Sequence, residues 1–524
     1  MDADVLVVGA GPTGLMLALQ LARRGVSVVI VEAHSGPARE TRALGVQART
    51  LEIEAHLGIV ARAIELGTPA LGARMWAGGR RRAHVRLDDV GRHLTPYPYV
   101  LILGQDDTER LLGDRLRAEG VDVRWNCELV GLTQEPDRVV ARLRESSGAT
   151  RDLHVSWVAG CDGAHSTVRQ LSRIPFEGAP YEHVFYLADV RMTGSMEPGE
   201  VNIYLWPSGF HLFFPMRGED HWRLVGILPR ALAGRADLTL DDVVPSIQKE
   251  AGNTLAFRHT EWFSTYRIHH RAAGRFRDGR CFLLGDAAHI HSPVGAQGMN
   301  TGLQDAYNLA WKLALVVSGE AGPELLDSYA EERIPVAKRL LATTDRVFSI
   351  AVSESRLTGE FRTRLLPAIL AIALEIPAVR HFVFRTISQT GIRYRRSRLS
   401  ENLAAPPAGA PRAGDRFPWI RLRLAADRPA EDLYEVLDDT RFVLLLFGQR
   451  PPAAPPMGLA ERLRILEVPD HPENARARAA ARIPSTAFYL LRPDGHVGLA
   501  GARLPPGALA AYAAGRLGLR LASG

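Results

Sequence analysis

The chain has 524 residues, of which 46% are hydrophobic and 23% charged, a composition typical of a globular protein with two or three domains. The formal net charge of +6 comes from arginines that are dispersed along the chain, which argues against a nucleic-acid-binding surface. Cys127, Cys161 and Cys281 lie far apart, and no CxxC or HExxH spacing occurs. The sequence therefore predicts neither a disulfide framework nor a metal site, and it favours a reducing compartment.

No segment predicts export or membrane insertion. The first ten residues lead directly into an apolar run, without a basic region or a cleavage site. The most apolar later stretch, Leu365–Val379, is interrupted by Pro367, Glu375 and Pro377, and is too short to span a bilayer. We expect a cytoplasmic protein, either a monomer or a homodimer.

The N-terminus has the pattern of a strand, a glycine-rich turn and a helix. Asp4–Val8 predicts a buried strand, Gly9–Gly14 reads GAGPTG, and Leu15–Arg24 has helical spacing. A second apolar run, Val26–Val31, ends at Glu32, the offset at which an acid holds ribose hydroxyls in a dinucleotide site. The arrangement indicates a nucleotide-binding βαβ unit with a pyrophosphate at the helix N-terminus.

The next region continues this unit and then changes pattern. Val121–Trp125, Leu129–Leu132 and Val139–Leu143 predict an antiparallel meander. The apolar run at residues 157–160 returns the chain to the nucleotide sheet, which places Asp162 near the crevice at the ends of the strands.

A second sheet is predicted from four alternating segments: Phe185–Met192, Val201–Trp206, His211–Met216 and Trp222–Ile227. Its aromatic residues suit either an ordinary core or a wall for a planar ligand: Phe185, Tyr204, Trp206, Phe213 and Trp222. Tyr204, His211 and Arg217 are candidate substrate contacts, although each residue type is more often structural.

The most informative stretch is Gly285–Ala314, which reads GDAAHIHSPVGAQGMNTGLQDAYNLAWKLA. It follows a short apolar run and ends in helical spacing, with Gly295, Gly298 and Gly302 around Gln297 and Asn300. Such a loop lets backbone N–H groups approach a ligand, and the helix after it favours a group that becomes negative. The alternative is a glycine-rich connection without a ligand.

The C-terminal part forms a separate module after the proline-rich linker Ala404–Gly414. Arg441–Phe447 and Ala487–Leu491 predict buried strands, and the second is followed by the turn Arg492–Gly495. The module resembles a thioredoxin-like α/β fold but contains no cysteine, so thiol chemistry is excluded and a structural or dimerisation role remains.

Three signatures, Gly9–Gly14 with Glu32, Gly160–Gly163 with Arg169, and Gly285–Asn300, resemble in order and spacing the single-component, class A flavin aromatic monooxygenases. The closest resemblance is to the branch of phenol hydroxylase-like and aromatic polyketide hydroxylases, including rifampicin monooxygenase-like enzymes. It implies an α/β protein with a Rossmann-like FAD-binding domain of the glutathione-reductase type (1–175 and 270–400), an antiparallel-sheet substrate domain (176–269) and a thioredoxin-like domain (401–524).

The resemblance also implies roles for individual residues. In the first signature, the ADP half of FAD would be held by Gly9, Gly11, Pro12, Thr13, Gly14 and Glu32. Arg42 and Gln105 match contacts to the phosphate and the ribityl chain, Asp162 matches an acid linked to both FAD and NAD(P)H, and Asp286 would bind the ribityl chain. The flavin ring itself would meet Pro293 at its reactive face and Gly298, Met299 and Asn300 at its pyrimidine edge.

The implied reaction uses NADPH or NADH, O2 and a C4a-hydroperoxyflavin to hydroxylate an aromatic molecule. In simple phenol hydroxylases of this family an acid contacts the phenol at the position where this chain has Leu44. The departure favours a larger, already acidic phenol or hydroxyquinone as substrate. Baeyer–Villiger oxidation, epoxidation, inactivation of an antibiotic, and a flavoprotein that only sequesters an aromatic drug remain alternatives.

Overall fold

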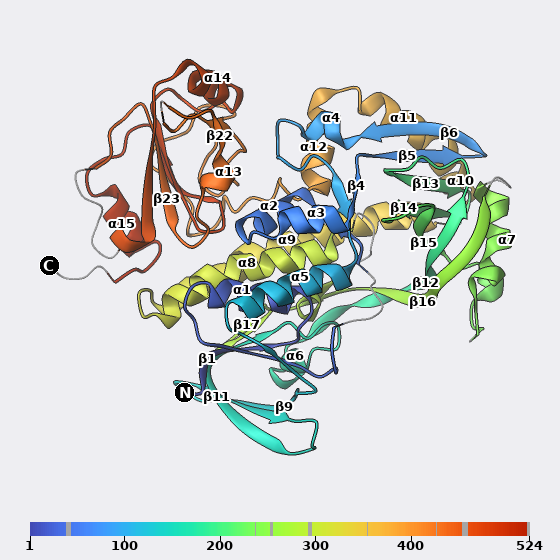
Figure 1. Cartoon of the computed structure of the whole chain (residues 1–524), viewed down its shortest axis with the longest axis horizontal. Coiled ribbons are helices and arrows are strands. Elements are labelled where there is room, and N and C mark those ends of the chain that lie inside the picture. The colour runs from blue at the N-terminus through green and yellow to red at the C-terminus, as the bar shows by residue number, and fades with distance from the viewer. Residues whose placement is uncertain are drawn as a thin grey trace.

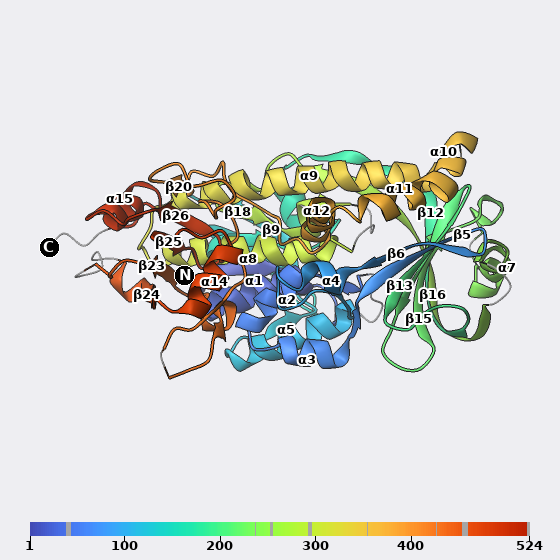
Figure 2. The same cartoon turned by 90° about the horizontal axis from the view of Figure 1, so that it is seen from above.

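The computed structural model describes residues 1–37, 43–235, 237–251, 255–291, 296–353, 355–425, 427–452 and 459–520. The molecule is elongated, with a nucleotide-type sheet and its helices in the middle, a second sheet at one end and the C-terminal unit at the other (Figures 1 and 2).

The central sheet is built on β1 (Ala3–Val8), which lies between β2 (Val28–Glu32) and β11 (Thr150–Gly160). β8 (Val123–Trp125) and β18 (Cys281–Leu283) extend it, and all five strands are parallel. The predicted meander is present as β9 (Glu128–Gln134) and β10 (Val139–Arg144), antiparallel beside β11; β17 (Arg277–Asp278) adds an antiparallel edge. Carboxyl ends of the parallel strands therefore meet at one edge.

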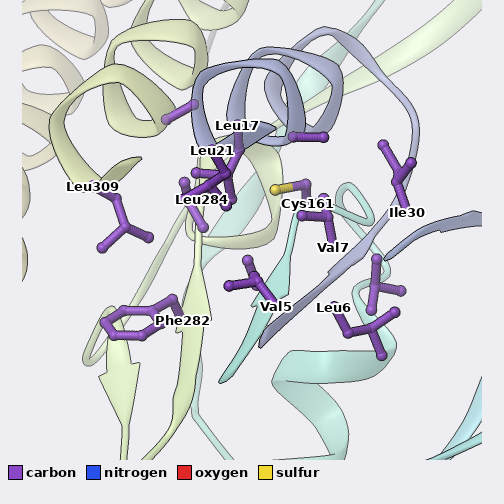
Figure 3. Close-up of a cluster of buried hydrophobic side chains, with 14 of the residues drawn as sticks. Val5, Leu6, Val7, Leu17, Leu21, Ile30, Cys161, Phe282, Leu284 and Leu309 are labelled. Carbon is purple, nitrogen blue, oxygen red and sulfur yellow. The ribbon is translucent and has the colours of Figure 1, made fainter. Parts of the chain in front are cut away.

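One face of this sheet is covered by α1 (Pro12–Ala22), α5 (Gln105–Ala118) and α8 (Gly298–Val317) (Figure 1). Figure 3 shows how Val5 and Val7 of β1 meet Leu17 and Leu21 of α1. Strands buried on both faces explain why these segments read as continuous apolar runs. Cys127, Cys161 and Cys281 are buried free thiols.

The second sheet has the order β19-β16-β12-β15-β14-β13-β5-β6. Its members are β5 (Gly72–Ala77), β6 (Arg80–Arg86), β12 (Phe176–Thr193), β13 (Glu200–Trp206), β14 (Gly209–Pro215), β15 (His221–Ile227), β16 (Ala256–Ala273) and β19 (His289–Ile290). The helix α7 (Leu240–Ala251) covers one face. The sequence predicts that residues 1–175 belong to the FAD-binding domain. In the structure, β5 and β6 from this range belong to the second sheet, because β5 pairs in parallel with β13.

The C-terminal unit contains a mixed sheet in the order β20 (Glu401–Asn402), β26 (Val497–Gly501), β25 (Ala487–Leu491), β23 (Phe442–Phe447) and β24 (Leu463–Val468). The two strands predicted from the sequence are its central pair, β23 and β25. The short pair β21 (Arg421–Leu422) and β22 (Glu431–Asp432) and the helices α13 (Leu433–Val436), α14 (Pro472–Ala480) and α15 (Ala508–Gly515) complete the unit.

The remaining elements of the first 175 residues are short. The strands β3 (Gly45–Val46), β4 (Thr68–Ala70) and β7 (Val100–Ile102) form a small sheet, and the helices are α2 (Ala48–His56), α3 (Val60–Leu66), α4 (Leu87–Gly91) and α6 (Thr167–Leu171).

The long helix α9 (Asp327–Val352) runs along the molecule from the C-terminal unit towards the second sheet (Figure 2). It is followed by α10 (Arg356–Glu360), a π-helical turn at Phe361–Leu365, α11 (Leu366–Ala373) and α12 (Pro377–Ile387). Within the described ranges no single helix has the length and apolar character of a membrane span; only Leu357–Ala373 and Pro377–Ile387 together meet that criterion, and they are bent by 109°.

Candidate functional site: a cavity between the glycine turn and the second sheet

The glycine turn after β1 is shaped by three glycines with different constraints. A Cβ atom on Gly9 would lie 2.4 Å from the carbonyl oxygen of Cys161, and one on Gly14 would lie 1.9 Å from the carbonyl oxygen of Gly9. Both glycines are therefore required for packing within the protein. A Cβ on Gly11 would meet nothing within 4 Å. The open space beside Gly11, at the N-terminus of α1, is a cradle of the kind that accepts a phosphate.

Glu32, at the end of β2, holds this turn from behind. Its Oε2 accepts a hydrogen bond from the backbone N–H of Ala10 at 2.8 Å, and its Oε1 accepts one from the N–H of His34 at 3.1 Å. The acid predicted as a ribose ligand thus also orients the backbone of the glycine turn.

The turn at Gly285, which follows β18, packs against α1 and α8. Added Cβ atoms on Gly285 and Gly302 would lie 2.7 and 2.3 Å from Oγ1 of Thr13. Glycine at both positions lets the third signature approach the first. This close approach joins segments separated by more than 270 residues in the chain, Thr13 with Gly285.

A buried ionic cluster fixes the same turn. Oδ2 of Asp305 accepts a hydrogen bond from the N–H of Gly285 at 3.1 Å and pairs with Nε2 of His289 at 2.8 Å, while Oδ1 pairs with Nε of Arg333 at 2.6 Å. Burial alone would raise the pKa of Asp305, but its ion pair with Arg333 and its contact with His289 outweigh burial and lower the pKa.

The second signature links to the third through Arg169. Its guanidinium donates to the carbonyl oxygens of Ala287 at 2.9 Å and Ala164 at 2.7 Å. Asp162 accepts a hydrogen bond from the N–H of Val168, at the start of α6, at 3.1 Å, and burial raises its pKa. In this structure Arg169 and Asp162 act mainly on the backbone.

The helix α8 begins at Gly298, so Gly298–Asn300 form its first turn. Gln297, the N-cap residue, makes no side-chain capping bond, and the first N–H groups of a helix lack intrahelical partners. The helix therefore presents N–H donors without intrahelical partners and a positive dipole end at its N-terminus.

The side chain of Asn300 is fully buried and bonds to other parts of the protein. Its Oδ1 accepts hydrogen bonds from the N–H of Gln47 at 2.8 Å and the hydroxyl of Thr50 at 2.7 Å. Its Nδ2 donates to the carbonyl oxygens of Gly45 at 2.7 Å and Ala296 at 2.8 Å. Asn300 thus attaches the segment before α2 to the start of α8.

These elements enclose a cavity of about 510 Å³. On one side it is lined by the glycine turn, the segment 43–45, Gln105, the Gly285 turn and the first turn of α8; on the other side lie Leu187, Phe210, Leu212, Phe214, Arg223 and Val225 of the second sheet. The sheet side is apolar apart from Arg223, whose Nε and Nη2 each lie 2.5 Å from an oxygen of Asp189. The size and the lining are typical of a small-molecule site.

A second cavity, of about 340 Å³, lies on the other side of the glycine turn and is lined in part by Ala10, Leu15 and Trp125. Trp125 is the register partner of Glu32 in the adjacent strand. Two cavities that meet at one glycine turn fit a ligand with two ends joined by a pyrophosphate. The residues present therefore fit a dinucleotide such as FAD.

The predicted cofactor residues fall into three groups. Those that line the large cavity are Gly11, Pro12, Thr13, Gln105, Asp286, Gly298 and Met299. Those that lie behind its wall are Gly9, Gly14, Glu32, Asp162 and Asn300. Arg42 and Pro293 lie outside the described residues.

None of the three candidate substrate contacts lines the cavity. Tyr204 is 2% exposed and stacks on Trp76, in the core under α7. His211 is fully buried beside the hydroxyl of Tyr186, at 2.7 Å, and burial lowers its pKa to about 3. Arg217 is exposed after β14. Tertiary packing accounts for Tyr204 and His211, whereas Arg217 lies on the surface.

The aromatic wall is made by different residues from those expected. The five aromatics named from the sequence pack into two cores, whereas Phe210 and Phe214 face the cavity. Both faces of β14 are apolar, with Phe210 and Phe214 on one side and Phe213 on the other. Alternation could have indicated both faces but could not tell which one meets a ligand.

Comparison with known proteins identifies the family. Residues 2–344 match the family described as FAD binding domain, and residues 410–518 match aromatic-ring hydroxylase, C-terminal. The chain belongs to the FAD-binding aromatic-ring hydroxylases. It is a FAD-dependent monooxygenase with a mixed α/β fold.

Individual relatives cover nearly the whole chain. It is similar to 6-methylpretetramide 4-monooxygenase of Streptomyces rimosus, with 34% identity over 95% of this chain and 91% of the relative. It is similar to rifampicin monooxygenase of Streptomyces venezuelae, with 34% identity over 95% of each chain. Among solved structures, OxyS anhydrotetracycline hydroxylase from Streptomyces rimosus matches with a TM-score of 0.79, 28% identity and 99% of both chains covered.

Proposed function

We propose that this monooxygenase hydroxylates a multi-ring phenolic, polyketide or quinone molecule, bound in the cavity of about 510 Å³ beside the flavin, with NADPH or NADH as reductant. The observation that carries the proposal is the two-sided lining: motif segments of a flavin site on one wall and Phe210, Leu212 and Phe214 on the other. The names of the relatives, which include a rifampicin monooxygenase and an anhydrotetracycline hydroxylase, support a large aromatic substrate.

In the proposed site, the start of α1 at Gly11–Thr13 holds the pyrophosphate of FAD, and Glu32 holds the ribose. Gln105 and Asp286 reach the ribityl chain, and Gly298 and Met299 adjoin the pyrimidine end of the ring. Gly9, Gly14, Asp162 and Asn300 shape these walls. Arg42 and Pro293, at the phosphate and at the reactive face, remain proposals from the family resemblance.

When bound, FAD supplies hydride acceptance from NAD(P)H and activation of O2 for transfer to an arene. The chain's own contribution is positional and electrostatic. The N–H groups at the start of α8, which lack intrahelical partners, would stabilise negative charge at the pyrimidine end of a bound flavin. The apolar side chains of β14 exclude water from the reacting atoms.

Leu44 lines the cavity at the position where related phenol hydroxylases carry an acid. An apolar side chain cannot accept a proton from a phenol. The substrate therefore has a hydroxyl group acidic enough to ionise without a base at Leu44, as in a hydroxyquinone or a polycyclic phenol.

The finer architecture follows the same reasoning. We assign a Rossmann-like FAD-binding domain of the glutathione-reductase type to 1–175 and 270–400, with β5 and β6 contributed to the substrate domain at 176–269. The residues 401–524 form a thioredoxin-like domain without cysteines. The parallel order of the central sheet and the mixed sheet of the C-terminal unit support this division.

The test is the purified protein with FAD, NADPH or NADH and a panel of polycyclic phenols under ¹⁸O2. We expect a yellow protein, faster NAD(P)H oxidation with substrate, and a product that gains one ¹⁸O on a ring carbon. A protein that cannot be reconstituted with FAD would overturn the proposal. NAD(P)H oxidation with an unmodified bound aromatic would indicate a sequestering protein, and an ester or epoxide product would indicate Baeyer–Villiger or epoxidising chemistry.

A further inference from the structure

The turn Arg492–Gly495 of the C-terminal unit is inserted into the FAD-binding part of the chain. Arg492 pairs through Nη1 and Nη2 with Glu332 of α9, at 2.6 and 3.0 Å. Oδ2 of Asp494 accepts from Nε1 of Trp311, on α8, at 3.3 Å, and the hydroxyl of Tyr307 donates to the carbonyl oxygen of Pro493 at 3.2 Å. The turn therefore contacts both long helices.

All of these groups are buried. The side chains of Arg492 and Glu332 are 0% exposed, and that of Asp494 is 2% exposed. Lys312 of α8 completes the cluster, with Nζ 2.8 Å from Oε2 of Glu332. Charges removed from water in this way hold a fixed geometry only when every partner is in place.

The C-terminal unit also contacts α2 through a second set of ion pairs and hydrogen bonds. Arg416, just before β21, forms a two-pronged ion pair with Glu52 of α2, with Nε 2.9 Å from Oε2 and Nη2 in contact with Oε1. Arg49 of α2 pairs with the same carboxylate at 3.0 Å and donates to the carbonyl oxygen of Asp494 at 2.6 Å. Figure 1 shows α13 of the C-terminal unit beside α2.

The N-terminus of α2 in turn lies directly after the cavity-lining segment 43–45. Gln47 and Thr50 bind Oδ1 of Asn300, and Gly45, which lines the cavity, binds its Nδ2. A continuous set of hydrogen bonds and ion pairs thus leads from Arg416 through Glu52 and α2 to the start of α8.

We propose that the C-terminal unit is a positioning device for the flavin site: Arg416 and the Arg492–Gly495 turn set the position of α2, and α2 sets the segment 43–47 against the first turn of α8. The inference rests on the proposed location of FAD in this cavity. Arg416, Glu52 and Arg49 are positioning residues, because none of them lines the cavity within the part of the chain that the structure describes.

A unit that only adds stability would contact the rest of the protein without regard to the cavity. Here the second contact set ends on α2, the helix that follows the cavity-lining segment 43–45. A contact elsewhere on the interface serves as a control: Nη2 of Arg462 lies 2.6 Å from Oε1 of Glu320, beyond the far end of α8, with both side chains about a third exposed.

The experiment compares Arg416→Met, Arg416→Lys and the control Arg462→Met in the full-length protein. Three measurements are made: the Kd of the apoprotein for FAD by fluorescence titration, hydrogen exchange of the peptides that cover 43–56 and 298–306 in the FAD-bound protein, and the thermal unfolding midpoint. Product formed per NAD(P)H oxidised is a fourth readout once a substrate is in hand.

For Arg416→Met we expect about a tenfold rise in the Kd for FAD and faster exchange in both peptides. Arg416→Lys, which keeps one ion pair with Glu52, should restore part of the affinity. Arg462→Met should change neither readout, even where it lowers the unfolding midpoint.

The inference is overturned if Arg416→Met and Arg462→Met lower the unfolding midpoint alike and leave FAD affinity and both peptides unchanged. If Arg416→Met does not fold, the comparison of Arg416→Lys with Arg462→Met tests the inference by the same measurements. A wild-type protein that binds no FAD would instead refute the proposed function, so the two failures are distinct.

Discussion

Oδ1 of Asn300 lies 2.8 Å from the backbone nitrogen of Gln47, which is 253 positions away in the chain. The bond joins the start of α2 to the start of α8, the two helix ends beside the cavity. Replacement of Asn300 by Leu leaves buried N–H and C=O groups without partners, at about 1–3 kcal/mol each. We expect a protein of lower stability whose Kd for FAD rises by about tenfold or more, measured by fluorescence titration.

Asn300→Asp is the matched control for this variant. It keeps the acceptor for Gln47 and Thr50 and loses the donor to Gly45 and Ala296. An affinity between those of wild type and Asn300→Leu is expected. Equal FAD affinity in all three proteins would contradict the role assigned to Asn300.

Two alanine substitutions in the glycine turn should affect different properties, one the binding of FAD and the other folding. Gly11→Ala projects a methyl group into open space at φ −70°, a conformation any residue adopts, so folding is retained while FAD binding weakens. Gly14→Ala forces a Cβ within 1.9 Å of the carbonyl oxygen of Gly9, so folding itself is impaired. Thermal unfolding of the apoproteins together with FAD titration separates these effects. A Gly11→Ala protein with wild-type FAD affinity would place the cofactor elsewhere.

Glu32 orders the turn by accepting the N–H of Ala10, and the same carboxylate is proposed to hold the ribose. Glu32→Ala removes both contacts, and we expect a loss of about tenfold to a hundredfold in FAD affinity. Glu32→Gln retains an acceptor oxygen and should lose less. The measurement is the fraction of FAD retained after gel filtration, checked by titration.

Phe214 and Phe213 are neighbours in β14 and face opposite sides of the sheet. Phe214→Ala enlarges the cavity, so we expect a higher KM for an aromatic substrate with an unchanged Kd for FAD. Phe213→Ala leaves a hole in the core under α7 and should cost about 3–5 kcal/mol of unfolding free energy without a specific effect on KM. Steady-state kinetics and urea unfolding of both variants test the assignment of the two faces. The reverse pattern would show that the ligand binds on the Phe213 face of β14.

Glu54 of α2 should make the free energy of unfolding depend on pH. Burial raises its pKa from 4.5 to about 8, so the folded state holds a proton that the unfolded state releases at lower pH. The stability contributed by this proton is complete below pH 4.5 and is lost, at about 1.4 kcal/mol per pH unit, as the pH rises to 8.

The check is urea unfolding of wild type and Glu54→Gln between pH 4 and pH 9. The difference in unfolding free energy, wild type minus variant, should fall across this window and level off above pH 8. A constant difference would show that Glu54 has an ordinary pKa. Because Glu54 lies on α2, we expect FAD affinity, like the stability contribution, to decrease as the pH rises.

Much of the site was predictable because its signals are local. The glycines at Gly9, Gly11 and Gly14, and those at Gly285 and Gly298, stand at fixed offsets from apolar strands, and each offset corresponds to a turn or a helix start. The features that local spacing does not reveal are those in which a side chain acts across the fold. Asn300 stands beside Gly298 in the sequence, and its side chain binds the backbone of a segment some 250 positions earlier.

The sequence alone determined the class of protein, through three different signatures in a fixed order: the strand, turn and helix with an acid at the end of the next strand, the segment Gly160–Gly163, and the segment Gly285–Asn300. Only the tertiary structure decided which apolar face of β14 meets the cavity, because a strand that is hydrophobic on both sides has no preferred orientation by pattern. It also decided that Arg49, Glu52 and Arg416 meet, since an ion pair between residues more than 360 positions apart depends on packing that no local spacing encodes.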